Sequence, residues 1–260
     1  MVKRRLIPKL LLRPIQFGNQ QRMVLVTTCQ FDKMVNAGDP VSQAKIYEAQ
    51  SADELIFVNI RPEEQDRQLV LNIIRKVSEE IFMPVTIGGG VKSIKDFRDL
   101  LNNGADKVSV NTAAVKDPSL IKKASDHFGA QCVVVSIDYK MVNGKAEVYI
   151  ENGKKATGMD PISWAKEAEK LGAGEILLTS IDHDGMQEGL DLNMLGQICK
   201  EVKIPVIASG GCGLATHFIE GFKAGADAVS AGTFFCFKDQ SPIQTRSHIR
   251  NAGIPVRLHK

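Results

Sequence analysis

The sequence predicts a single (β/α)₈ barrel over residues 1–260, built from two half-barrels of about 1–125 and 126–250. Short apolar runs alternate with longer amphipathic stretches, which is typical of parallel strands joined by helices. The second half also repeats the first at a constant offset, because Asp39-Pro40 recurs as Asp160-Pro161 and 160 − 39 = 121. The same shift relates Gly89-Gly90 to Gly210-Gly211. An open doubly wound sheet would explain the alternation but not the repeat.

The predicted strands are short and almost continuously apolar, as expected where both faces of a parallel sheet are covered. They are Arg5–Leu12, Glu54–Ile60, Pro84–Ile87, Lys107–Val110, Cys132–Asp138, Glu175–Thr179, Pro205–Ala208 and Ala228–Ala231. Amphipathic spacing predicts intervening helices over Pro40–Gln50, Arg67–Ile81, Ile94–Asn102, Ile162–Leu171 and Ala215–Ala224.

Two longer connections follow the first and fifth strands, over Arg13–Gly38 and Met141–Met159. In a barrel of this kind, the connections after strands lie on the face that carries the active site. Within the second connection, we expect Glu147–Ile150 and Lys154–Ala156 to form a small hairpin.

The composition is that of an ordinary soluble enzyme, with 43% hydrophobic and 24% charged residues. A net charge of +3 is too small to indicate binding to nucleic acid or to an anionic membrane. Pro8 and Lys9 interrupt the basic, leucine-rich opening, so we expect a barrel strand there and no signal peptide or membrane span. The five cysteines are scattered without CxxC spacing, which predicts a cytoplasmic protein without a metal site or disulfides. No cofactor is indicated.

Glycine-rich turns follow the third and seventh strands, at Gly88-Gly89-Gly90 and Ser209-Gly210-Gly211. Glycine lets the backbone approach a ligand, so that amide hydrogens and the next helix N-terminus can bind phosphate. Asn111-Thr112 and Gly232-Thr233, after the fourth and eighth strands, would add donors beside each turn. The alternative is that these glycines only permit tight turns. Two symmetric copies favour a substrate with two phosphates or two anionic ends.

Carboxylates follow two of the predicted strands. Asp138 ends the fifth strand and should point into the mouth of the barrel, where it could act as a general acid or base. Asp182 and Asp184 follow the sixth strand and could serve the same chemistry, although one of them is expected to cap a loop or helix start. His183 lies between them and is interpreted as a loop residue.

Four charged residues begin strands at the opposite end of the barrel, namely Arg5, Glu54, Lys107 and Glu175. Two cations and two anions at strand starts could form a ring that closes the barrel floor. Composition alone favours a salt-bridge plug, since this face of the barrel usually carries stability.

Together these residues resemble the cyclase subunits of imidazole glycerol phosphate synthase, the HisF family. The similarity runs through nearly the whole chain, and its motifs are far more specific than those of a generic barrel. They include Gly38-Asp39-Pro40, Ala52-Asp53-Glu54-Leu55, Gly88-Gly89-Gly90, Gly104-Ala105-Asp106-Lys107-Val108-Ser109, Asn111-Thr112-Ala113-Ala114-Val115, Val133-Val134-Val135-Ser136-Ile137-Asp138 and Ala208-Ser209-Gly210-Gly211.

The resemblance implies a subunit that receives ammonia from a glutaminase docked at the barrel floor, in a heterodimer, and uses it on a phosphorylated small molecule at the upper face. It implies a catalytic role for Asp138. From its position after the sixth strand, we also expect a catalytic role for Asp182. The resemblance also implies a charged gate for ammonia at Arg5, Glu54, Lys107 and Glu175. Phosphate binding is expected at Gly89, Gly90, Asn111, Thr112, Asp184, Gly185, Gly210, Gly211, Gly232 and Thr233.

The departures from the family pattern affect the upper face. Leu11 stands where the family has its other catalytic aspartate, Thr27 where a mobile-loop lysine is expected, and Asn59 where an aspartate follows the second strand. Loss of a catalytic acid typically costs on the order of 10²–10⁴ in rate.

The leucine triplet Leu10-Leu11-Leu12 is similar to a divergent HisF branch linked to acetamidino sugars and surface polysaccharides. We therefore expect a HisF-like ammonia-using subunit in amidino-sugar formation. The alternatives are a working cyclase of histidine biosynthesis and a catalytically silent scaffold that conducts ammonia.

Overall fold

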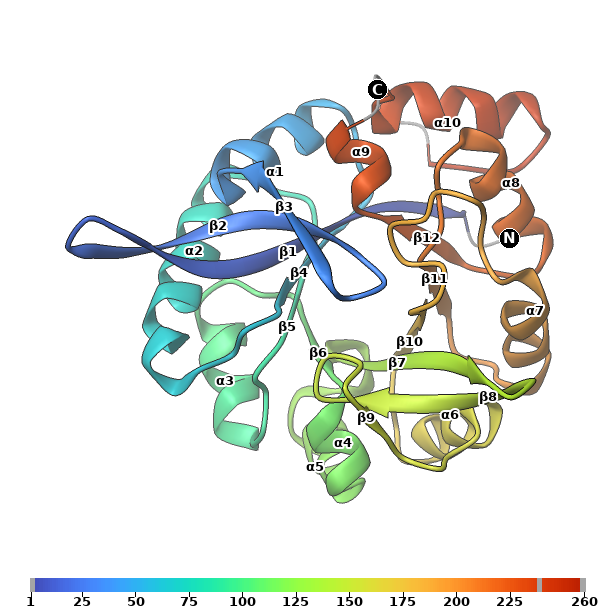
Figure 1. Ribbon diagram of the computed structural model, residues 1–260, viewed down its shortest axis with the longest axis horizontal. Helices are drawn as coiled ribbons and strands as arrows, with labels where there is room; N and C mark the ends of the chain where they lie inside the picture. The colour runs from blue at the N-terminus through green and yellow to red at the C-terminus, as the bar shows by residue number, and fades with distance from the viewer. Residues whose placement is uncertain (1–2, 238–239, 258–260) are drawn as a thin grey trace.

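Eight parallel strands close into a barrel, as the sequence predicts (Figure 1). The computed structural model describes residues 3–237 and 240–257. Around the barrel the order is β1, β4, β5, β6, β7, β10, β11 and β12, and β12 pairs with β1 to close the ring. The strands are β1 (Arg5–Phe17), β4 (Leu55–Asn59), β5 (Val85–Gly88), β6 (Lys107–Val110), β7 (Val133–Val142), β10 (Glu175–Ser180), β11 (Val206–Ser209) and β12 (Ala228–Ala231).

Helices surround the barrel and cover its outer face (Figure 1). They are α1 (Pro40–Ala49), α2 (Arg67–Glu80), α3 (Ile94–Asn102), α4 (Thr112–Lys116), α5 (Ser119–Phe128), α6 (Pro161–Lys170), α7 (Leu192–Glu201), α8 (Ala215–Lys223), α9 (Thr233–Phe237) and α10 (Pro242–Asn251). Two 3₁₀ turns lie at Glu64–Asp66 and Ala130–Cys132. In the described part of the chain no helix has the length and apolar character needed to cross a bilayer.

Alternation along the strands separates two apolar regions. Side chains that point outward pack against the helices and form the larger core. Side chains that point inward form a second cluster that fills the middle of the barrel, as expected for a packed interior and not a pore. This inner cluster is fully buried and consists of Ile7, Ile56, Val134, Leu177, Ile207 and Ala228.

The internal repeat has equivalent structural roles in both halves. Asp39 and Asp160 cap α1 and α6 by accepting hydrogen bonds from backbone N–H groups three residues on, each at 2.8 Å. The carboxylate of Glu48 accepts from the backbone N–H groups of residues 82 and 83, and Glu169 does the same for residues 203 and 204. Since 203 − 82 = 121, these contacts keep the offset of the sequence repeat, which supports a duplicated half-barrel.

The first long connection is built of antiparallel strands, and the predicted end of the first strand at Leu12 was wrong. β1 continues to Phe17 and pairs antiparallel with β2 (Gln20–Cys29), which pairs in turn with β3 (Lys33–Gly38). Figure 1 shows the tip of the β1–β2 hairpin projecting beyond α2. The extension forms because Met23 and Leu25 of β2 are buried, so that this segment has its own apolar face.

The second long connection contains the predicted hairpin. β8 (Lys145–Ile150) pairs antiparallel with β9 (Lys155–Ala156), so the prediction is confirmed to within two residues. The same pairing extends β7, which the sequence ended at Asp138, as far as Val142. Asp138 therefore lies inside a strand that is held on both sides, by β10 and β8.

Candidate active site

The carboxyl ends of the barrel strands surround a central cavity of about 380 Å³, whose wall includes Asp138, Lys9 and Leu11. A neighbouring hollow of about 740 Å³ shares Asp138 and extends over the first glycine turn. A smaller space of about 30 Å³ shares Lys9 and Leu11 and reaches the second glycine turn. Because the three share lining residues, they form one mouth with Asp138 near its centre and a glycine turn at each end.

The Asp138 carboxylate is held by neutral donors. Asn111 donates to its Oδ2 at 2.7 Å and Ser136 to its Oδ1 at 3.3 Å. Burial raises the pKa of Asp138 to about 6, even though Lys9 and hydrogen bonds from Ser136 and Thr179 act in the opposite direction. A carboxyl with such a pKa can take up and release a proton near neutral pH, which suits a general acid or base.

The other two candidate aspartates lie in different surroundings. Asp184 lines the small space beside Lys9, and its Oδ2 accepts a hydrogen bond from Thr28 at 2.6 Å. Burial raises its pKa, against the effects of Lys9 and Thr28. The Asp182 carboxylate accepts from the backbone N–H of Met141 at 2.8 Å, which ties the sixth-strand loop to the end of β7. Asp182 is absent from the lining of all three spaces, so a catalytic role for it stays a prediction.

The predicted loop residue His183 lies in the turn after β10, where its Nδ1 is 2.8 Å from the hydroxyl of Ser180. It is likewise outside the described lining of the central cavity.

The first glycine turn packs tightly against the end of β4. Gly89 has φ +91°, and a Cβ at this position would overlap the carbonyl oxygen of Asn59. Beyond the turn, Asn111 and Thr112 line the same hollow, but both already have partners. Asn111 orients Asp138, and the Thr112 hydroxyl accepts from the backbone N–H of Glu151 at 3.0 Å. The glycine is thus required by packing, and phosphate binding here stays a prediction.

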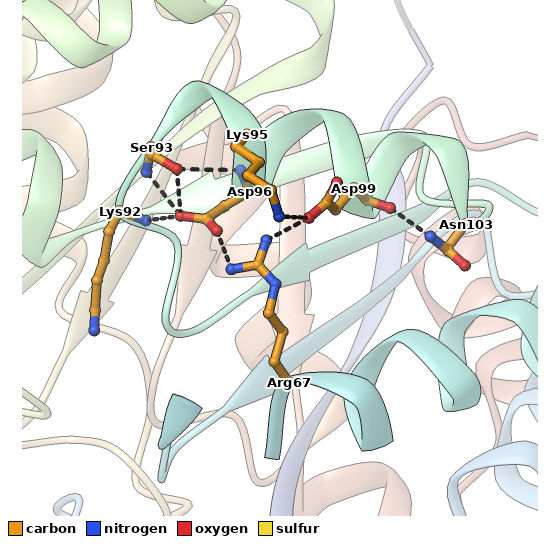
Figure 2. Close-up of polar contacts among 7 residues, drawn as sticks. All are labelled: Arg67, Lys92, Ser93, Lys95, Asp96, Asp99 and Asn103. Atoms are coloured by element: carbon orange, nitrogen blue, oxygen red, sulfur yellow. Dashed lines mark hydrogen bonds and ion pairs between the residues drawn. The ribbon is translucent and has the colours of Figure 1, made fainter. Parts of the chain in front are cut away.

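A network of ion pairs and hydrogen bonds fixes the chain just after this turn (Figure 2). The carboxylate of Asp96 accepts from the backbone N–H groups of Lys92 and Ser93, both at 2.8 Å, and pairs with Arg67 from α2. Arg67 also bridges to Asp99 at 2.8 Å. The network therefore ties helix α2 to the start of α3 directly after the glycine turn, at this end of the mouth.

The second glycine turn repeats this geometry. Gly210 has φ +92°, and a Cβ would lie 2.5 Å from the carbonyl oxygen of Ser180, the residue equivalent to Asn59 since 180 − 59 = 121. The small space beside this turn is lined by the predicted phosphate residues of the second half and covered by strand β2. Those predicted residues are Asp184, Gly185, Gly210, Gly211, Gly232 and Thr233.

At the opposite end, the four predicted floor residues form a closed ring of alternating charge. Arg5 pairs with Glu54 at 2.8 Å and with Glu175 at 2.7 Å, and Lys107 pairs with the same carboxylates at 3.0 Å and 2.9 Å. Burial alone would raise the pKa of Glu54, but Arg5 and Lys107 hold it below its usual value. Four ion pairs thus link these residues across the barrel floor, and the role of the ring as a gate stays a prediction.

Lys9 is a residue of this site that the sequence motifs do not mark. Its side chain is 8% exposed and lies inside the barrel, where Nζ donates to the hydroxyls of Ser209 at 2.9 Å and Thr179 at 3.5 Å. The signal was available, because Lys9 is four residues after Arg5 on one strand and must share its inward face. Leu11, two residues further on, lines the same cavity with an apolar side chain.

Comparison with known proteins gives the family. A model described as "Histidine biosynthesis protein" matches residues 15–241. The chain is 49% identical, over the full length of both proteins, to the "Putative imidazole glycerol phosphate synthase subunit hisF2" of Prochlorococcus marinus (strain MIT 9313). It is 45% identical to the "Imidazole glycerol phosphate synthase subunit HisF" of Clostridium botulinum (strain Okra / Type B1), covering 99% of this chain and 100% of that protein. The barrel, the duplicated glycine turns and these similarities show that the chain belongs to the HisF family of histidine biosynthesis proteins.

Proposed function

We propose that this chain is an ammonia-using HisF-type subunit that works with a glutaminase at its barrel floor, and that it is a divergent paralogue acting in acetamidino-sugar formation. One observation carries the proposal. Asp138, with a pKa of about 6, faces a cavity in which the family's other acid position is the hydrocarbon side chain of Leu11. The cavity thus keeps one proton-transfer group while its second acid is absent.

The interior of the barrel supports a route for ammonia from floor to mouth. The ring of Arg5, Glu54, Lys107 and Glu175 is followed by the buried apolar layer and then by the hydroxyls of Thr179 and Ser209. Neutral ammonia crosses an apolar layer at far lower cost than a charged ammonium ion. At the mouth, ammonia would add to a C=O or C=N carbon of the substrate. The new C–N bond forms as the π electron pair of that carbon moves to its oxygen or nitrogen, and the proton released from the ammonium nitrogen would pass to Asp138.

The two glycine turns support a substrate with two anionic ends. They lie at opposite ends of one mouth, each backed by a strand end and followed by a helix start. Backbone N–H groups in such turns bind phosphate. We therefore propose a phosphorylated or nucleotide-linked small molecule, with its reacting carbon near Asp138.

A second candidate is the cyclase reaction of histidine biosynthesis. It is favoured by the full-length identity of 45% to proteins named imidazole glycerol phosphate synthase subunit HisF. It requires that Asp138, with or without Asp182, suffices for proton transfer.

The deciding experiment is turnover of the histidine-pathway bisphosphate by purified protein in excess ammonium salt, alongside a Leu11→Asp variant. We expect the unmodified protein to bind the bisphosphate with little turnover, and Leu11→Asp to raise the rate on the order of 10²-fold. Robust turnover without the substitution would refute the divergent assignment in favour of the cyclase. A third outcome would identify a silent conducting scaffold. In that case the unmodified protein turns over no amidino-sugar precursor, and Asp138→Asn still binds the bisphosphate and still activates the glutaminase.

A further inference from the structure

A buried lysine at the base of the mouth has no part in the function proposed above. Along β1 the inward side chains are, in order, Arg5 in the floor ring, Ile7 in the apolar layer, Lys9 above that layer and Leu11 in the cavity wall. A lysine so deeply placed is costly unless its charge is compensated. The groups that compensate it therefore indicate what it does.

The direct partners of Lys9 are neutral. Its Nζ donates to Ser209 at 2.9 Å and to Thr179 at 3.5 Å, and neither hydroxyl carries a charge. Thr179 is the residue beside Asp138 in the strand register, and its side chain favours the ionised form of Asp138. Thr179 therefore lies next to both Lys9 and Asp138, which places the cation and the carboxylate at one level of the barrel.

Charge compensation comes from two carboxylates. Lys9 favours the ionised form of both Asp138 and Asp184, and all three line the spaces at the base of the mouth. Asp184 opposes Lys9 at Asp138, because the two carboxylates repel. Other charged side chains border the same mouth from the outer side, and they are Arg61, Glu63, Lys92, Lys116, Asp117, Glu151 and Lys154. Among the described residues that line these spaces, Lys9 is the buried cation.

We propose that Lys9 is a positioning residue for Asp138, whose ε-ammonium holds the Asp138 carboxylate in its charged form at the base of the cavity. This rests on the proposed role of Asp138 as the proton acceptor. It explains how the cavity keeps a competent base beside the apolar wall of Leu11. Without Lys9, burial and the negative charge of Asp184 would raise the pKa of Asp138 further, so that less of the carboxylate would be free to accept a proton.

The test is a ¹³C NMR titration of the Asp138 side-chain carboxyl in the unmodified protein, Lys9→Met and Lys9→Arg, with the resonance assigned by its absence in Asp138→Asn. The unmodified protein should titrate near pH 6. Lys9→Met should raise the midpoint by about one to two pH units, as expected for loss of a nearby opposite charge. Lys9→Arg, which keeps the cation, should stay near the unmodified value. Lys9→Gln provides a second neutral variant that can still hydrogen-bond Ser209 and Thr179, should Lys9→Met fail to fold.

An unchanged midpoint in a folded neutral variant would overturn the proposal. The titration needs no substrate, so it decides the pairing even if the proposed reaction fails. Where ammonia-driven turnover is measurable, the acid limb of its pH–rate profile should lie at higher pH in Lys9→Gln than in the unmodified protein. In Lys9→Arg it should lie at the same pH as in the unmodified protein. A purely structural role for Lys9 would lower the rate equally at every pH, and that result would also overturn the proposal.

Discussion

Replacing Asp138 with asparagine separates its function from its effect on stability. The substitution keeps the shape of the side chain and an oxygen that can accept from Asn111, but it removes the proton-transfer group. We expect Asp138→Asn to abolish ammonia-dependent turnover while the barrel remains folded. The same change should stabilise the protein above neutral pH. In the unmodified protein the Asp138 carboxylate is charged and buried at that pH, which is unfavourable, whereas asparagine is neutral.

The size of this stabilisation follows from the pKa of Asp138, which rises from 3.8 to about 6 on folding. The difference of about 2.2 units corresponds to about 3 kcal/mol, at about 1.36 kcal/mol per unit. Since the folded state holds the proton more tightly, this stability is fully present below pH 3.8 and is lost as the pH rises through 6. About one third of this stability has been lost by about pH 4.5. The rest, about 2 kcal/mol, is lost between about pH 4.5 and pH 8.

Urea unfolding at these two pH values measures the effect. The free energy of unfolding of Asp138→Asn, relative to the unmodified protein, should increase by about 2 kcal/mol from the lower to the higher pH. Asp99→Asn is a control, because a hydrogen bond from Lys95 and the pairing with Arg67 lower the pKa of Asp99 below its ordinary value of 3.8. Asp99 is therefore ionised at both pH values, and the relative stability of Asp99→Asn should stay nearly constant over the same interval. A pH-independent difference for Asp138→Asn would refute the assignment of Asp138 as a buried carboxyl with a raised pKa.

Two further predictions concern the floor ring and the glycine turn. Lys107→Glu should lower stability by about 3–5 kcal/mol by breaking a buried network, whereas Lys45→Glu at an exposed ion pair should cost less than about 1 kcal/mol. In enzyme assays, Lys107→Glu should impair glutamine-dependent activity more than ammonium-dependent activity, and equal losses would show that the ring only stabilises the barrel. Gly89→Ala should cost about 1–3 kcal/mol more than Gly144→Ala in urea unfolding, because both positions have positive φ but only at Gly89 would the Cβ meet backbone. Equal costs would show that the turn relaxes freely.

The local sequence pattern was sufficient to predict the eight barrel strands and five of the helices around them. Strand segments such as Ile176–Leu178 are apolar throughout, because helices cover one face and the barrel interior the other. Glu48 and Glu169, which lie 121 residues apart, make equivalent hydrogen bonds in the two halves of the barrel. The sequence pattern predicted the end of the first strand wrongly at Leu12, because that strand continues to Phe17. The continuation depends on pairing with β2, and pairing between segments is not encoded in the period of either one.

The sequence by itself determined the fold, the family resemblance, the two glycine turns and the four floor charges. These follow from periodicity, from a repeat at a constant offset and from residues at strand ends, all of which can be read along the chain without knowing which segments pack together. Only the tertiary structure decided which side chains share the mouth. It brought Lys9 to Thr179, from 170 residues away in the chain, and Asn111 to Asp138, and it directed the carboxylate of Asp182 to the backbone of Met141. The physical reason is that burial and the charge of distant neighbours set the pKa of a carboxyl, and both exist only when the barrel closes.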